Sequence, residues 1–205
     1  MQAIRQYFSE QGFLEVETPV RIPANAPEEY IDPVPTLTWQ LQTSPEICMK
    51  RLLCRGYDKL FQICRCWRSE ERGTRHLSEF TMLEWYRSNA DYHNLMQDCL
   101  GLLQHVADSC TIDSCFTRNH SKIDPHATWQ HFSVKEAFLR FAKADVLASI
   151  ENRLFDELLT GLVEPSFEKY NVPVILQDYP AQLAALSRLH ADQPDVAERF
   201  ELYVG

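Results

Sequence analysis

The sequence lacks any apolar run close to the roughly 20 residues that a membrane-spanning helix needs. Its N-terminus also lacks the apolar segment of a signal peptide. Positive charge is scarce as well, because 20 Lys and Arg residues stand against 29 Asp and Glu residues, which gives a net charge of -9. We therefore expect a soluble, cytoplasmic protein with no membrane partner and no general attraction for nucleic-acid backbones. Any nucleotide site must be local.

The seven cysteines include no C-x-x-C pair, and their number is odd. This spacing indicates neither a disulfide framework nor a zinc site, and we predict no metal site from it. Cys64 and Cys66 alternate along a predicted strand and share one face, so we interpret them as free buried thiols.

The composition, 45% hydrophobic and 24% charged over 205 residues, predicts a folded chain with one substantial core. Apolar periodicity and capping residues predict helices at 1–11, 45–55, 92–106, 134–141 and 150–162. Alternation predicts strands at 13–18, 37–41, 60–68, 79–87, 172–176 and 200–204. The proline-rich segment 21–35 and the polar segment 111–130 predict irregular structure. No linker divides the chain convincingly.

Strands 60–68 and 79–87, with turn-forming residues between them, predict an antiparallel hairpin. Period 2 places Phe80, Met82, Glu84 and Tyr86 on one face of its second strand. Burying an unpaired carboxylate there would cost several kcal/mol, so Glu84 must meet water, a protein cation or a ligand cation. A site for an amine is one solution.

Charge also gathers at the turn of the hairpin, where Arg68 precedes Glu70 and His76. Guanidinium groups match phosphate oxygens bidentately, so a phosphate site is one interpretation. A solvated turn with weak surface ion pairs is the other, and composition alone favours it. Glu46 likewise is either an amine ligand or a carboxylate that complements the dipole of its own helix. The residues alone leave function open.

Several stretches resemble the class II aminoacyl-tRNA synthetases, in the form used by lysyl-tRNA synthetase and its short paralogues. Motif 1 of that family resembles QGFLEVETPV, whose closing proline is Pro19, and motif 2 resembles RCWRSEERGTRHLSEFTMLEWYR. Further similarity lies in LQTSPEICMKRLL, LQDYP and RFELYVG. The resemblance implies an α+β fold, an antiparallel sheet flanked by helices, in one catalytic domain over residues 1–205. It also implies a homodimer formed through motif 1.

The resemblance assigns roles to particular residues. Arg68 would hold the α-phosphate of ATP and stabilise charge during adenylate formation. Glu70 would contact the adenine amino group, and Phe80 would stack on the base. The implied ATP-binding residues are Arg68, Ser69, Glu70, His76, Leu77 and Phe80. The implied pocket for a lysine-type amino acid consists of Ser44, Pro45, Glu46, Glu84 and Tyr86.

The start of the chain at motif 1 and the strand TMLEWYR favour the short paralogues, which activate (R)-β-lysine with ATP and attach it to a lysine of elongation factor P. The resemblance thus implies ATP and Mg2+ as cofactors, elongation factor P as partner and no role for tRNA. It leaves no N-terminal OB-fold domain and places the magnesium-binding glutamates and the motif 3 arginine beyond Gly205. Leu77 stands where the family has asparagine.

Two alternatives stay open at this point. A lysyl-tRNA synthetase core without its anticodon-binding domain would carry the same motifs. A non-catalytic lysine sensor would keep the amine pocket and lose nucleotide use, although Arg68, Glu70 and His76 together favour nucleotide use. Both α-lysine and (R)-β-lysine would present ammonium groups to the same carboxylates.

Overall fold

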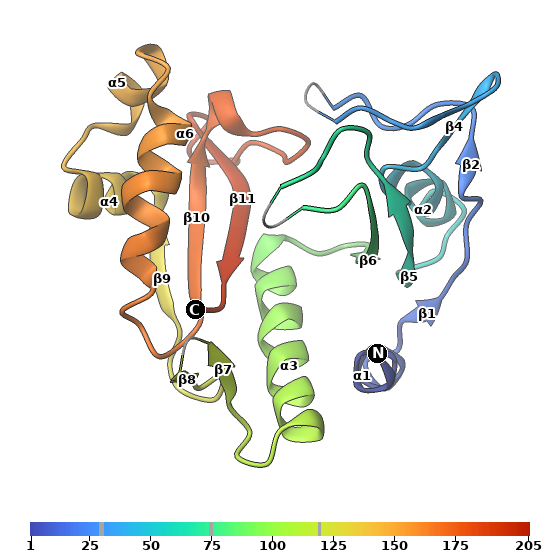
Figure 1. Cartoon of the computed structure of the whole chain (residues 1–205), viewed down its shortest axis with the longest axis horizontal. Coiled ribbons are helices and arrows are strands. Elements are labelled where there is room, and N and C mark those ends of the chain that lie inside the picture. Colours follow the sequence, from blue (N-terminus) through green and yellow to red (C-terminus); the bar gives the residue numbers. More distant parts are fainter. Residues whose placement is uncertain (29–30, 74–75, 119) are drawn as a thin grey trace. The chain divides into compact units, whose positions relative to one another are not determined.

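A computed structural model describes residues 1–28, 31–73, 76–118 and 120–205. Its contacts divide the chain into two compact units, Met1–Ala90 and Asp91–Gly205, which are coloured from blue to green and from green to red in Figure 1. Compactness and catalytic function are different criteria for a domain, so the single catalytic domain over 1–205 stays a prediction. Mixed helices and antiparallel strand pairs confirm the predicted α+β class.

The first unit contains two small sheets and two helices. Its elements are α1 (Gln2–Glu10), β1 (Leu14–Glu15), β2 (Arg21–Ile22), β3 (Pro35–Thr36), β4 (Trp39–Leu41), α2 (Glu46–Leu53), β5 (Lys59–Trp67) and β6 (Glu79–Arg87). One sheet has the order β1-β5-β6, with β1 parallel and β6 antiparallel to β5. The other has the order β2-β4-β3 and is antiparallel. The first sheet carries the predicted hairpin.

The β5–β6 hairpin has the predicted pairing, and β5 differs from the predicted strand only by starting and ending one residue earlier. The residues directly opposite each other are Gln62 and Glu84, Cys64 and Met82, and Cys66 and Phe80. Opposed residues lie on the same face of a sheet, so these six side chains form two adjacent rows. The turn 69–78 includes residues 74 and 75, which lie outside the described residues.

An aromatic cluster joins α1 to the other face of this hairpin. Phe8 is fully buried and stacks on Phe61, with the ring centroids 4.8 Å apart and the planes 15° from parallel. Phe13 and Trp85 also contact the Phe8 ring, at centroid distances of 5.1 and 5.4 Å. Gly12, predicted to end the helix, has φ +76°, a conformation that favours glycine. The cluster thus packs α1 against the face of the hairpin that lies opposite Glu84.

Three local predictions in this unit were partly wrong. Segment 21–35 was expected to be irregular, yet its two ends form β2 and β3, because both can pair with β4. Leu37 was expected in a half-buried strand but has φ +60° and is 97% exposed, since it lies in the turn between β3 and β4. Helix α2 begins one residue later than predicted, with Pro45 at the N-cap, although the Ser44 hydroxyl still accepts the Glu46 N–H at 3.3 Å. Residues 29 and 30 of segment 21–35 lie outside the described residues.

The second unit packs helices against a three-stranded sheet of order β11-β10-β9, drawn in yellow to red in Figure 1. Its strands are β7 (Phe116–Arg118), β8 (Ser121–Ile123), β9 (Gln130–Ser133), β10 (Val174–Pro180) and β11 (Val196–Tyr203). Its helices are α3 (Tyr92–Cys110), α4 (Val134–Ala137), η1 (Phe138–Ala142), α5 (Val146–Glu151), α6 (Phe155–Leu158), η2 (Leu159–Val163), η3 (Glu164–Phe167) and η4 (Ala181–Leu183). A core that includes Phe138, Val174 and Leu176 fills the space between them.

Capping predictions in this unit are confirmed, whereas two longer segments differ. Asp91 with Asn94 and Ser133 with Glu136 both form capping boxes at helix starts. The single helix predicted at 150–162 is interrupted, because Arg153 adopts φ +57° between α5 and α6. The polar segment 111–130, expected to be irregular, contains the antiparallel pair β7–β8. None of the helices in the described ranges is long and apolar enough to cross a membrane.

The substitution Phe8→Ala should destabilise the protein by about 3–5 kcal/mol, because it empties the centre of the aromatic cluster that anchors the sheet. Urea denaturation followed by circular dichroism measures this. Leu37→Ala is the control, and it should change the free energy of unfolding by less than about 0.5 kcal/mol because Leu37 is exposed. Equal effects of the two substitutions would contradict the assigned anchor.

Candidate functional site

Two predicted amine ligands and a tyrosine come together beside the start of α2. Glu46 is the first residue of α2, and its Oε1 lies 2.5 Å from Nζ of Lys50, one turn further along the helix. Glu84 of β6 accepts a hydrogen bond from the Tyr86 hydroxyl. The Lys50 Nζ also lies 5.9 Å from the centroid of the Tyr86 ring. Lys50 thus links the two carboxylate positions, a contact that sequence reasoning missed.

The Glu84 carboxyl group has a strongly perturbed pKa. Burial raises the pKa of Glu84 from its ordinary value of 4.5 to about 7, and the nearby charges of Glu46 and Glu28 push it the same way. The Tyr86 hydrogen bond and the Lys50 charge lower the same pKa but do not compensate. Three carboxylates around one ammonium group therefore leave the site short of positive charge. A ligand cation would relieve this deficit.

Glu28 belongs to this electrostatic group, although the sequence indicated it only as an acidic residue of an irregular loop. Its charge raises the pKa of both Glu84 and Tyr86. Burial is the largest cause of the raised pKa of Tyr86, which therefore keeps its proton and remains a hydrogen-bond donor at neutral pH. Local sequence patterns could not reveal this interaction, because Glu28 and Glu84 are more than 50 residues apart in the sequence.

A buried amide lies beside Glu84. Gln62 is only 2% exposed and faces Glu84 directly across the hairpin. Its Oε1 accepts the Thr18 hydroxyl at 3.0 Å, whereas its Nε2 has no hydrogen-bond partner within the described part of the chain. An unpaired buried donor of this kind costs about 1–3 kcal/mol of stability. Strand alternation had placed Gln62 on this face without assigning it a role.

The predicted phosphate ligand Arg68 lies at the other end of the same face. Its guanidinium carbon is 5.2 Å from the centroid of the Phe80 ring, and its Nη1 is 3.7 Å from Oε1 of Glu71. The Arg68 Nε is buried and has no hydrogen-bond partner among the residues described. Phe80 and Glu84 are four residues apart on β6, about 13 Å along a strand. The Arg68 guanidinium and the Glu84 carboxylate therefore lie apart on this face by about the length of a small molecule.

The residues after Arg68 shape an open pocket of about 680 Å³. Its lining includes Arg72, His76 and Leu77, and Leu77 is 70% exposed. The Ser69 N–H donates to the carbonyl of Asp32 at 2.7 Å, and Glu70 has φ +60°. The structure therefore brings Arg68 into contact with Phe80, and it places His76 and Leu77 in the lining of one pocket. Ser69 and Glu70 lie between Arg68 and His76 in the sequence.

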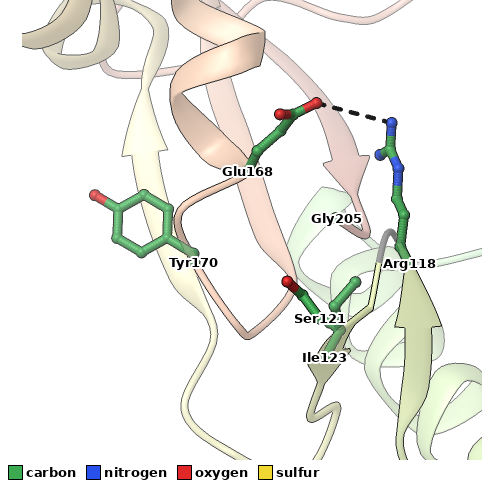
Figure 2. Close-up of a pocket in the computed structure, with 6 residues that line it drawn as sticks. All are labelled: Arg118, Ser121, Ile123, Glu168, Tyr170 and Gly205. Carbon is green, nitrogen blue, oxygen red and sulfur yellow. Dashed lines mark ion pairs between the residues drawn. The ribbon is translucent and has the colours of Figure 1, made fainter.

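A small pocket of about 110 Å³ lies in the second unit, where Arg118 of β7 and Glu168 point toward each other at 4.0 Å (Figure 2). None of the predicted site residues lines it. Within the described ranges, no group of three or more His, Cys, Asp or Glu side chains is arranged to hold a metal ion.

The chain is α+β, with Arg68 beside the Phe80 ring at one end of the hairpin face and with Glu84 of β6 near Glu46 of α2. The family model for tRNA synthetases of class II (D, K and N) matches residues 1–205, and the chain belongs to that family. It is also similar to three bacterial proteins named elongation factor P–(R)-β-lysine ligase. The protein of Pectobacterium atrosepticum is 36% identical, over 98% of this chain and 66% of that protein. Those of Salmonella gallinarum and Salmonella paratyphi B are each 37% identical, over 99% of this chain and 67% of theirs. The chain thus spans about two thirds of the length of these relatives.

The raised pKa of Glu84 predicts a specific pH dependence of stability. The folded state holds the Glu84 proton more tightly than the unfolded state, so this contribution is complete below about pH 4.5 and is lost as the pH rises through 7. Glu84→Gln should therefore raise the free energy of unfolding by about 1–3 kcal/mol at pH 8 relative to its effect at pH 4. Chemical denaturation at both pH values measures the difference.

Glu151→Gln is the control, because Glu151 is an exposed carboxylate of α5 that does not contribute to the raised pKa of Glu84. It should show no gain of stability between pH 4 and pH 8. If Glu84→Gln and Glu151→Gln respond alike, the burial of Glu84 is not the cause.

Proposed function

We propose that this protein is an ATP-dependent ligase that activates a lysine-type amino acid, (R)-β-lysine in particular, and transfers it to a lysine of elongation factor P. The observation that carries the proposal is the single hairpin face on which Glu84 and the Arg68–Phe80 pair lie in one row. Family membership and the names of the similar bacterial proteins support it. We further propose a cytoplasmic homodimer that needs no tRNA.

The amine end of the face suits a diamine. Glu84 gives up its proton near neutral pH, and a bound ammonium group favours its charged form. Glu46 would bind the second ammonium group, after Lys50 moves aside or shares the carboxylate. The Tyr86 hydroxyl donates to Glu84 and would orient this carboxylate toward the ammonium group. Ser44 and Pro45 lie next to Glu46 and form the adjacent wall.

The guanidinium end suits the phosphates and base of ATP. The Arg68 guanidinium lies over the Phe80 ring and 3.7 Å from Glu71, and it would donate to an oxygen of the α-phosphate. As the amino-acid carboxylate attacks the α-phosphorus and pyrophosphate leaves, Arg68 would stabilise the added negative charge. Phe80 presents a ring for stacking on the base, and His76 and Leu77 would reach the nucleotide from their own pocket in the turn.

The second step needs a nucleophile from the acceptor protein. The neutral amine of an acceptor lysine attacks the carbonyl carbon of the aminoacyl-adenylate, an amide bond forms and AMP leaves. Mg2+ would neutralise the phosphate charges, although the described residues include no group of three or more His, Cys, Asp or Glu side chains arranged to hold it.

The decisive experiment is amino-acid-dependent exchange of pyrophosphate into ATP without tRNA, with (R)-β-lysine and α-lysine compared. Exchange that prefers (R)-β-lysine, followed by labelling of elongation factor P, would establish the proposed activity. Exchange with α-lysine alone would favour a lysyl-tRNA synthetase core instead. Binding of lysine without any exchange would overturn the ligase in favour of a sensor.

Arg68→Ala should reduce the exchange rate at least about 100-fold, because removal of one donor that stabilises transition-state charge costs 10²–10³-fold. Arg65→Ala is a matched control on the opposite face of β5, where the Arg65 side chain is 60% exposed. Lysine binding measured by calorimetry should persist in both variants. Equal turnover of the two variants would show that Arg68 is only a surface cation.

Glu84→Gln should abolish detectable binding of lysine. The substitution removes a buried carboxylate whose charge the protein itself neutralises only in part. In the unsubstituted protein, binding should strengthen as the pH rises from about 6 to 8, because Glu84 becomes charged over that range. Glu151→Gln, at an exposed position of α5, should leave binding unchanged. Calorimetry at both pH values gives these affinities, and pH-independent binding would remove Glu84 from the site.

A further inference from the structure

Two thiols lie in contact on the hairpin face between the amine end and the guanidinium end. Cys64 and Cys66 have their Sγ atoms 3.8 Å apart, and both thiols are free. The proposed function uses neither of them. Cys66 is fully buried, whereas Cys64 is half-buried. The pair therefore forms a compact sulfur site with one accessible member.

A third sulfur atom belongs to the same patch of the sheet. Met82 lies directly opposite Cys64 in the hairpin register, and opposed side chains on one face have their Cβ atoms about 4.5–5.5 Å apart. Thiolate and thioether ligands together select soft metal ions, copper(I) above all. The sequence spacing concealed this group, because Met82 is distant in sequence and methionine is not part of the usual zinc patterns.

The spacing of the two thiols matches bonds to one metal ion. With a metal–thiolate bond of about 2.3 Å and an angle at the metal between tetrahedral and trigonal, the two sulfur atoms are about 3.8–4.0 Å apart. The observed 3.8 Å falls in this range. A linear two-sulfur arrangement would need about 4.6 Å between the atoms, so a bent site with room for a third ligand fits better.

Cys64 is the member of the pair that an ion can reach from solvent. This thiol lines an open pocket of about 650 Å³ whose charged lining residues have both signs, Arg5 and Arg65 against Glu15 and Glu17. The Gln42 Nε2 donates to the Cys64 sulfur at 3.5 Å and holds it in place. Cys64 is thus the first ligand and the buried Cys66 the second.

We propose that Cys64, Cys66 and Met82 form a binding site for one copper(I) ion. Both thiols release their protons to solvent as the two sulfur–copper bonds form, and the ion keeps its oxidation state. Glu84 lies next to Met82 on the same face of β6, and Arg68 lies two residues beyond Cys66. A bound ion therefore occupies the floor between the two ends of the site. If the proposed function holds, the ion inhibits amino-acid activation.

The test is anaerobic titration of the reduced protein with copper(I) held by a coloured chelator, bathocuproine disulfonate. The starting variant carries Cys54→Ser and Cys110→Ser, which remove two exposed thiols that could bind copper between molecules. One ion per chain should be taken from the chelator. Loss of an outer-shell partner already weakens metal binding about 10–100-fold, so Cys64→Ser or Cys66→Ser should weaken it at least as much. Met82→Leu should weaken it less than either.

Cys48→Ser is the matched control, because Cys48 is a half-buried thiol of α2 outside the group, and it should leave copper affinity unchanged. If a variant does not fold, alkylation of the protein without these substitutions still tests the site. One equivalent of copper(I) should protect Cys64 from alkylation by N-ethylmaleimide, as read by peptide mass spectrometry. Undiminished copper affinity in folded Cys64→Ser and Cys66→Ser variants, or unprotected Cys64, would overturn the site.

The inhibitory consequence has a separate readout. One equivalent of copper(I) should abolish lysine-dependent pyrophosphate exchange in the starting variant and not in the same protein with Cys66→Ser. Copper binding without inhibition would overturn the inhibitory role and leave the site intact. Absence of exchange before copper is added would instead contradict the proposed function, and the chelator titration would still decide the site.

Discussion

The desolvated carboxylate of Glu84 is the constraint on which the rest of the site depends. A half-buried acid with a pKa near 7 destabilises the folded chain at neutral pH unless a cation reaches it. The chain tolerates this because the aromatic cluster around Phe8 holds the opposite face of the same hairpin rigid. Lys50 contributes partial neutralisation from α2. The site is therefore prepared for a ligand that brings positive charge.

The antiparallel register converts this constraint into a linear site. Because residues of β5 and β6 pair one to one without a bulge, Gln62 meets Glu84, Cys64 meets Met82 and Cys66 meets Phe80. Each pair places a different chemistry along the strand, from amide and carboxylate through sulfur to an aromatic ring beneath Arg68. A shift of one residue would turn all of these groups to the opposite face. Register is thus what places the Glu84 carboxylate and the Arg68–Phe80 pair on one face.

Local sequence rules are sufficient to predict some elements of this protein and not others. Capping boxes at Asp91 and Ser133 and the strand from Glu79 to Arg87 followed from nearest-neighbour chemistry and alternation, and the structure confirms them. The strands β2 and β3 did not follow, because pairing with β4 overrides the proline-rich composition of their loop. The break at Arg153 also escaped, since nothing in the apolar pattern marks a left-handed residue. Long-range pairing and isolated backbone turns are what local patterns omit.

For the site, strand alternation in the sequence already indicates which residues share the hairpin face, because alternation depends on the order of residues alone. The sequence also carries the similarity by which the chain belongs to the class II synthetase family. The raised pKa of Glu84, the position of Lys50 beside Glu46 and the influence of Glu28 from a distant loop arise from the fold instead. The contact between the two thiols likewise depends on the fold. The physical reason is that desolvation, Coulomb interactions and hydrogen-bond satisfaction depend on neighbours in space, which sequence order does not specify.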